Sequence, residues 1–258
     1  MHNNNLKNII FAGLLIAIGI VLSNILSISY PPNSTIIRFG IGYLPLMLIS
    51  IILGPKVGFS AAIIQDVLGY FVYILVYGYA SGPFYLGFTF NAILYGVLPG
   101  IIYNLRFKDF NVFRYVNFAF LILMFGLGVW ATFNIDTIIY IIETKLSEDM
   151  TFSPWIIYLM LGIGEVGIIG LLIFLFGTRN EEDKMHRIIF SVIILQIIVT
   201  LILTPLWVLH MYGVPFWPQM PLRIIKTPIE IFIYSVLLIR VVKALKGYVF
   251  RDHAPSEN

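Results

Sequence analysis

Four charged side chains lie within or beside long apolar stretches of this sequence. Asp66 sits in the middle of one apolar run, Arg38 begins another, and Arg223 and Lys226 open the last one, a single helical turn apart. A charge inside a bilayer is costly, so it is normally kept for a partner or a function. A carboxylate accepts N–H donors, and Arg or Lys pairs with anions. The four residues therefore indicate a site for a polar small molecule.

Three of these charges, Asp66, Arg223 and Lys226, also have a structural explanation. Asp66 could hydrogen-bond to a buried hydroxyl or amide such as that of Tyr70 or Asn91, and this explanation has the same weight as ligand binding. The two cations could extend to the membrane interface. Glu230, one turn after Lys226, could pair with it. Residue type and spacing alone leave both possibilities open.

Composition identifies the class of protein. The chain has 258 residues, of which 59% are apolar and 11% charged, and its mean hydropathy is +0.93. Soluble domains carry about 25% charged residues, so the sequence predicts an all-α protein that crosses the lipid bilayer several times. Cysteine is absent and the four histidines are scattered, so no disulfide, metal site or bound cofactor is expected. The net charge of +3 gives no sign of nucleic-acid binding.

Apolar runs of about 20 residues predict eight membrane spans, the first of them retained rather than cleaved as a signal peptide. The expected spans lie near 7–28, 38–54, 57–78, 84–104, 116–142, 154–177, 187–210 and 222–245. Lys and Arg gather in the connections on one side of these spans, twelve against four on the other. Because basic residues mark the cytoplasmic side, we expect both termini in the cytoplasm and a multi-pass protein of the cell membrane.

Two small-residue patterns have more than one interpretation. Gly162 to Gly167 reads GIGEVG, which fits a dinucleotide-binding pattern. That motif works at a strand-to-helix turn, whereas here it lies inside an apolar run, so helix packing is the better interpretation. In the first span, Gly13 and Ala17 are four residues apart. They could pack within this protein or let a separate membrane subunit approach closely.

Several motifs, taken in order, resemble one known family. They are Arg38-Phe39-Gly40, Gly42-Tyr43-Leu44-Pro45, Leu53-Gly54-Pro55, Asp66-Val67-Leu68-Gly69, Gly82 to Thr89 (GPFYLGFT), and near the C-terminus Leu206-Trp207, Tyr212-Gly213 and Pro215-Phe216 with Arg223 and Lys226. This set resembles the substrate-binding (S) components of energy-coupling factor (ECF) vitamin transporters, of the folate type. The resemblance covers about 7–108 and 187–246.

The resemblance implies an architecture and a set of partners. The family has a six-helix core, so we expect helices 1–4 of that core in 1–108, an inserted pair of spans in 109–186, and the last two core helices with a basic tail in 187–258. An S component is not an enzyme. It binds a vitamin with high affinity and delivers it with a transmembrane coupling subunit and two ATPases, as part of an ABC importer. Gly13 and Ala17 stand where the family has a small-residue docking motif.

Residues and resemblance together suggest folate or a related pterin as the ligand. Aromatic side chains of the outer loops could stack on the ring, Asp66 could accept its N–H donors, and Arg38, Arg223 or Lys226 could pair with the glutamate tail. The candidate aromatic residues are Phe84, Tyr85, Phe88, Trp207, Tyr212 and Phe216. Riboflavin and a pantothenate-like anion stay open as ligands. The alternatives from other classes are an intramembrane enzyme using Asp66 or Glu165, and a stand-alone secondary carrier.

Overall fold

The computed structural model describes residues 2–24, 26–29, 38–79, 82–105, 112–145, 154–178 and 183–249. The helices and strands, in order, are α1 (His2–Asn24), β1 (Ile28–Ser29), β2 (Arg38–Phe39), α2 (Leu44–Leu53), α3 (Pro55–Tyr77), α4 (Leu86–Asn104), α5 (Val112–Phe133), α6 (Ile135–Lys145), α7 (Pro154–Gly177), α8 (Asp183–Leu195), η2 (Gln196–Leu203), α9 (Thr204–Tyr212), η3 (Trp217–Gln219) and α10 (Met220–Val249).

The expected all-helical membrane fold is confirmed. Among the described residues, six helical segments are long and apolar enough to cross a bilayer, and a seventh apolar helix, α2, is shorter. The first six are α1, α3, α4, α5, α7 and the continuous helix formed by α8, η2 and α9. The last helix, α10, is 30 residues long but carries several charges. The strands form a single antiparallel pair of two residues each.

Two expected spans differ from the helices observed. The run at 38–54 is helical only over Leu44–Leu53, because its first residues pair as a strand with Ile28–Ser29 before the turn into α2. The run at 116–142 is two helices rather than one. Asn134 separates α5 from α6, and its side-chain amide donates to the carbonyl of Trp130. A side chain that competes for backbone carbonyls is a common cause of a helix break.

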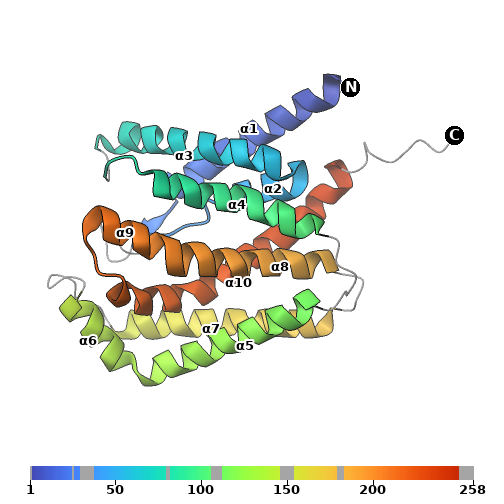
Figure 1. Cartoon of the computed structure of the whole chain (residues 1–258). Helices are drawn as coiled ribbons and strands as arrows, with labels where there is room; N and C mark the ends of the chain where they lie inside the picture. Colours follow the sequence, from blue (N-terminus) through green and yellow to red (C-terminus); the bar gives the residue numbers. More distant parts are fainter. Residues whose placement is uncertain are drawn as a thin grey trace.

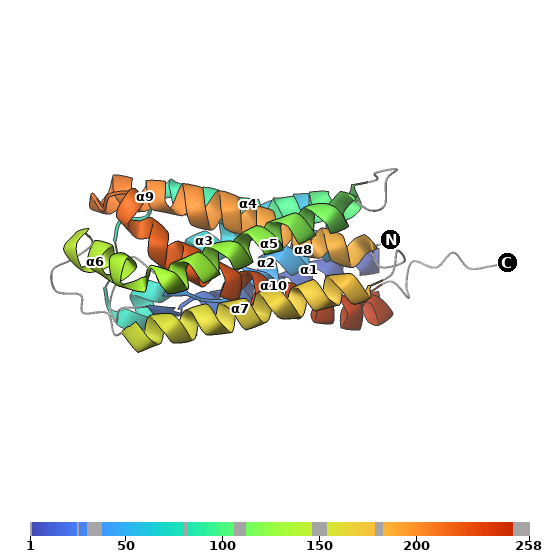
Figure 2. The ribbon, with the colours of Figure 1, turned by 90° about the horizontal axis from the view of Figure 1, so that it is seen from below.

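The helices form a bundle with two sides (Figure 1). α3 packs on α4 and α1, while α10 packs on α7 and on α8. Figure 1 shows α5 and α7 on the side of α10 that is away from α1 and α3, and in Figure 2, seen from below, α5 and α7 lie in front. Gly58 and Gly96 permit the close contact of α3 with α4, since a β-carbon at either position would collide with the backbone of the other. The start of α1 and the end of α10 lie at the same end of the bundle.

A π-helical segment, η2, interrupts the long helix between α8 and α9. At its end the N–H of Thr204 donates to the carbonyl of Val199, five residues back. The next donor in that pattern would be residue 205, but Pro205 has no N–H. The carbonyl of Thr200 is therefore left without its backbone donor. Such π-segments are frequent at functional sites.

The glycine pattern on α7 is a packing motif. Gly164 lies against Pro228 and Gly167 against Phe232, both on α10, whereas Gly162 has open space around it. The end of α5, α6 and the starts of α7 and α10 share a second hydrophobic core, separate from the main one. We call the segment Val112–Gly177, which comprises α5, α6 and α7, the α5–α7 unit.

Candidate functional site

A cavity of about 800 Å³ lies in the half of the bundle opposite the start of α1. Its wall is formed by α1, the turn before α2, α3, the loop between α3 and α4, α4, η2, α9 and α10. A volume of this size is typical of a small-molecule site. None of its described lining residues belongs to the α5–α7 unit. The elements of the six-helix core expected from the resemblance therefore build the cavity.

Seven of the ten side chains expected to bind a ligand come together in this wall, and two of the others, Trp207 and Phe216, do not. Those in the wall are Asp66, Phe84, Tyr85, Phe88, Tyr212, Arg223 and Lys226. Trp207 does not line the cavity, but its indole N–H donates to the lining residue Asn91. Phe216 packs edge-on against Trp217 outside the lining. The side chain of Arg38 lies outside the part of the chain that the structure describes.

Asp66 has a partner that the sequence analysis did not name. The hydroxyl of Thr89 donates to Oδ2 of Asp66 at 2.6 Å. The two expected structural partners bond elsewhere: Tyr70 donates to the carbonyl of Gly82, and the Asn91 amide donates to Thr204. An ionised carboxylate offers about four acceptor positions, and Thr89 is its one hydrogen-bond partner among the described residues. Asp66 therefore retains acceptor capacity while lining the cavity.

Amides and hydroxyls from α4, η2 and α9 supply a neutral polar section of the wall. Asn91 is held at both ends, because its oxygen accepts from Trp207 at 3.1 Å and its amide donates to Thr204 at 3.2 Å. In η2, the hydroxyl of Thr200 donates to Oε1 of Gln196 at 2.6 Å. Fixed amide groups can pair with a ligand edge that carries both N–H and C=O groups.

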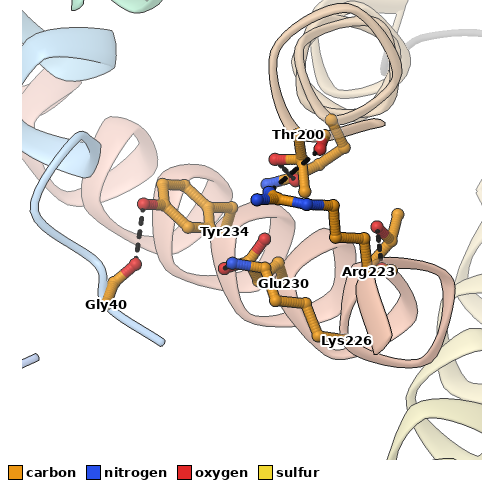
Figure 3. A network of polar contacts seen from close by, with 8 residues as sticks. Gly40, Thr200, Arg223, Lys226, Glu230 and Tyr234 are labelled. Carbon is orange, nitrogen blue, oxygen red and sulfur yellow. Dashed lines mark hydrogen bonds and ion pairs between the residues drawn. The ribbon is translucent and has the colours of Figure 1, made fainter. Parts of the chain in front are cut away.

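The charged section of the wall comes from α10 (Figure 3). Arg223 is 2% exposed and donates to the carbonyl of Thr200 at 3.3 Å and to Oε1 of Gln219 at 3.1 Å. Arg223 thus satisfies the carbonyl that Pro205 leaves without a backbone donor. Nζ of Lys226 lies 3.0 Å from Oε1 of Glu230, so the expected pair between these residues is present. Arg223, Lys226 and Glu230 lie on one face of α10, at helical spacing.

Stacked tyrosines form another part of the lining. The rings of Tyr43 and Tyr95 are parallel, with centroids 4.4 Å apart, and Tyr234 continues the stack at 6.5 Å from Tyr95. The hydroxyl of Tyr234 donates to the carbonyl of Gly40 at 3.0 Å (Figure 3). This stack links the turn before α2 to α4 and α10. The three tyrosines place aromatic rings in the lining next to the polar groups of the wall.

This stack and the polar groups Gln65, Gln196 and Thr200 were not predicted from the sequence. Tyr43 stands within a motif that carried the resemblance, but nothing pointed to its role in a stack. Gln196 and Thr200 are four residues apart in an apolar run, so their helical spacing was an available signal. Tyrosines in membrane helices are common at interfaces, so Tyr95 and Tyr234 gave no comparable signal.

Three further residues discussed for function lie outside the cavity. Gly13 and Ala17 face outward from α1, and Gly13 has nothing within 4 Å of the position of a β-carbon. Glu165 lies on α7 against Gly128 of α5. It is absent from the described lining that includes Asp66, so these two carboxylates do not form a shared site.

Comparison with known proteins gives the family. A family model described as ECF-type riboflavin transporter, S component, matches residues 3–148, which is more than half of the chain. A crystal structure of FolT bound with folic acid is similar in fold, with a TM-score of 0.53 and 20% sequence identity over 92% of this chain and 93% of that chain. No curated protein sequence matches. The expected resemblance to ECF S components is confirmed, and the family's members are transporter components rather than enzymes. The chain belongs to the family of ECF-type riboflavin transporter S components, which are membrane proteins.

Proposed function

We propose that this protein is the vitamin-binding subunit of an ECF-type importer and that its cavity takes folate or a related pterin from outside the cell. A coupling subunit and two ATPases would then complete the transport, because the chain itself has no phosphate-binding loop. The observation that carries the proposal is Asp66, an acceptor-only side chain in the wall of a cavity of suitable size beside stacked aromatic rings.

The chemistry of Asp66 favours a pterin over other flat rings. A pterin edge carries two adjacent donors, a ring N–H and an exocyclic amino group, which can bond side by side to one carboxylate. Oδ2 of Asp66 accepts from Thr89, which supports the carboxylate in one orientation. A flavin edge instead places one N–H between two carbonyl groups. Those carbonyl oxygens would meet the carboxylate oxygens and repel them, so Asp66 fits the pterin edge better.

We propose that Arg223 and Lys226 attract the glutamate tail of folate. Both belong to the first part of α10 and both line the cavity. Arg223 donates to the uncharged oxygens of Thr200 and Gln219, and these two hydrogen bonds hold its guanidinium group at the cavity wall. The name of the structurally similar protein, FolT bound with folic acid, agrees with this ligand.

Riboflavin is the second candidate, for a specific reason. Glu230 compensates the charge of Lys226, and the amides of Asn91 and Gln196 offer the mixed donors and acceptors that a neutral flavin needs. The description of the matching family names riboflavin. A neutral ligand would make little use of Arg223 and Lys226, so the two candidates differ in which residues they require.

Calorimetric titration of the purified protein with folic acid, pteroic acid and riboflavin separates these candidates. Pteroic acid has the pterin without the glutamate. We expect Asp66→Asn to weaken binding of folic acid and pteroic acid alike, by about 10- to 100-fold, since a bond to a charged group contributes about 1.5–3 kcal/mol. Arg223→Ala should weaken folic acid more than pteroic acid. Tight riboflavin binding that survives Asp66→Asn would contradict the folate assignment and support the flavin.

Two further measurements test the function class. Mass spectrometry after incubation should recover the ligand chemically unchanged; a modified product would support the enzyme alternative. In vesicles that contain this subunit alone, we expect binding without net movement of the vitamin down its gradient. Such movement would identify a secondary carrier.

A further inference from the structure

One face of the last helix, α10, lines the cavity and the opposite face packs against α7. Arg223, Glu230 and Tyr234 line the cavity. Pro228 and Phe232, on the opposite face, contact α7. With 3.6 residues per turn, Arg223 and Phe232 point in nearly opposite directions around the helix. α10 therefore lies between the cavity and α7, and one helix makes both contacts.

The contact between α7 and α10 has very little free space. A β-carbon on Gly167 would lie 2.8 Å from Cγ of Phe232, and one on Gly164 would lie 3.0 Å from Cβ of Pro228. Real β-carbons almost never approach another atom as closely as 2.8 Å. The two glycines thus set the separation of the helices. Small residues of this kind let membrane helices approach closely.

A second contact holds the beginning of α10. Leu222 and Ile225, each 1% exposed, belong to the second hydrophobic core, which α10 shares with α5, α6 and α7. The other buried members of this core all come from the α5–α7 unit: Ala131, Ile135, Ile138, Ile142, Ile157, Met160 and Leu161. Leu222 and Ile225 are the neighbours of Arg223 and Lys226 in the sequence, so the α5–α7 unit contacts the same turn of α10 that carries the cations.

We propose that the α5–α7 unit positions the binding site through its contacts with α10. Gly164 and Gly167 are the positioning residues, and they set the distance and rotation of α10 relative to the cavity. The unit contributes no described side chain to the cavity wall, so its effect on binding passes through α10. This inference rests on the proposed function, because it assumes that the cavity binds the vitamin. It assigns the expected inserted pair a role in ligand affinity.

Substitution of the glycines tests the proposal with a matched control on the same helix. Gly167→Val puts bulk against Phe232, whereas Gly162→Val adds the same side chain at an exposed position with nothing within 4 Å. We expect Gly167→Val to weaken folic acid or riboflavin binding, whichever the wild type binds, by about tenfold. Gly162→Val should leave affinity within about twofold. Combining Gly167→Val with Phe232→Ala should restore most of the affinity, because the smaller side chain makes room.

A distance measurement keeps the test independent of the ligand. The chain has no cysteine, so spin labels can be placed specifically at Ile233→Cys on α10 and Leu75→Cys on α3, both exposed positions. We expect the distance between the labels, measured by pulsed electron resonance without ligand, to shift in Gly167→Val and not in Gly162→Val. An unchanged distance and affinity in Gly167→Val, with only a lower melting temperature, would overturn the proposal. If the wild type binds neither vitamin but the distance between the labels still shifts in Gly167→Val, the proposed function is wrong. The positioning of α10 by the glycines would still stand.

Discussion

At the scale of single residues, two lining side chains, Asp66 and Asn91, are oriented by hydrogen bonds from residues that do not line the cavity. Thr89 bonds to Asp66 at 2.6 Å, and Trp207 bonds to Asn91 at 3.1 Å. A carboxylate or amide that is fixed before the ligand arrives loses less conformational freedom on binding. We therefore expect Thr89 to contribute to affinity by orienting Asp66.

We predict that Thr89→Val weakens binding of folic acid several-fold, because Asp66 loses the donor that orients it. Val has nearly the same shape as Thr, so packing should change little. Thr89→Ser keeps the hydroxyl and is expected to bind within about twofold of the wild type. Calorimetric titration of the three proteins measures the effect. Equal affinity in Thr89→Val and the wild type would show that Asp66 needs no support from Thr89.

At the scale of elements, the π-helical segment connects a backbone irregularity to the charged wall. Pro205 cannot donate to the carbonyl of Thr200, and Arg223 donates to that carbonyl instead. Arg223 therefore contributes to the contact between η2 and α10 as well as to the charge of the cavity. Its removal would leave a buried carbonyl without a donor, which costs about 1–3 kcal/mol.

This connection predicts an energetic coupling between two positions. In a Pro205→Ala background, residue 205 regains an N–H that can reach the carbonyl of Thr200. Arg223→Ala should then reduce the free energy of unfolding by about 1 kcal/mol less than it does in the wild type. Chemical denaturation in detergent measures both differences. A Pro154→Ala background, altered at the start of α7, serves as the control and should leave the cost of Arg223→Ala unchanged.

The expected spans show why sequence predicts some elements better than others. Asp66, Arg223 and Lys226 attracted attention because charge is rare in apolar runs, and all three line the cavity. The break at Asn134 and the π-segment were not predicted, since one polar residue or one proline in an apolar run is compatible with a continuous helix. The stack of Tyr43, Tyr95 and Tyr234 joins three distant segments, so no local pattern could reveal it.

At the scale of the whole molecule, the outward face of α1 and the cavity lie on different parts of the protein. Gly13 and Ala17 are exposed and do not line the cavity. We propose that the coupling subunit docks there, so docking and vitamin binding should be separable by mutation.

We predict that Gly13→Leu prevents co-purification of the coupling subunit and leaves vitamin affinity within about twofold of the wild type, because the added side chain would block close approach of another helix. Gly126→Leu on α5 is the matched control, since Gly126 is also exposed with nothing within 4 Å. If both variants lose the partner equally, the effect is not specific to α1. If neither does, docking occurs elsewhere.

Orientation in the membrane is a further prediction at this scale. Basic residues place the start of α8 in the cytoplasm and the loop before α10 outside. In a chain without native cysteine, Trp217→Cys should react with an impermeant maleimide on intact cells, and Lys184→Cys only after the cells are opened. Both positions are exposed. The reverse pattern would show that the cavity faces the cytoplasm.

Because Trp207 contacts Asn91 in the cavity wall, its intrinsic fluorescence should report on ligand binding. Pterins and flavins absorb in the range where indole emits, so a vitamin seated beside Asn91 should quench the emission of Trp207 by energy transfer. The other three tryptophans, Trp130, Trp155 and Trp217, are exposed, and Trp130 and Trp155 belong to the α5–α7 unit. Replacing Trp207 by Phe should therefore remove more of the quenching than Trp155→Phe does, because Trp207 is in contact with Asn91 in the cavity wall. Cargo capture could then be followed in real time without a label.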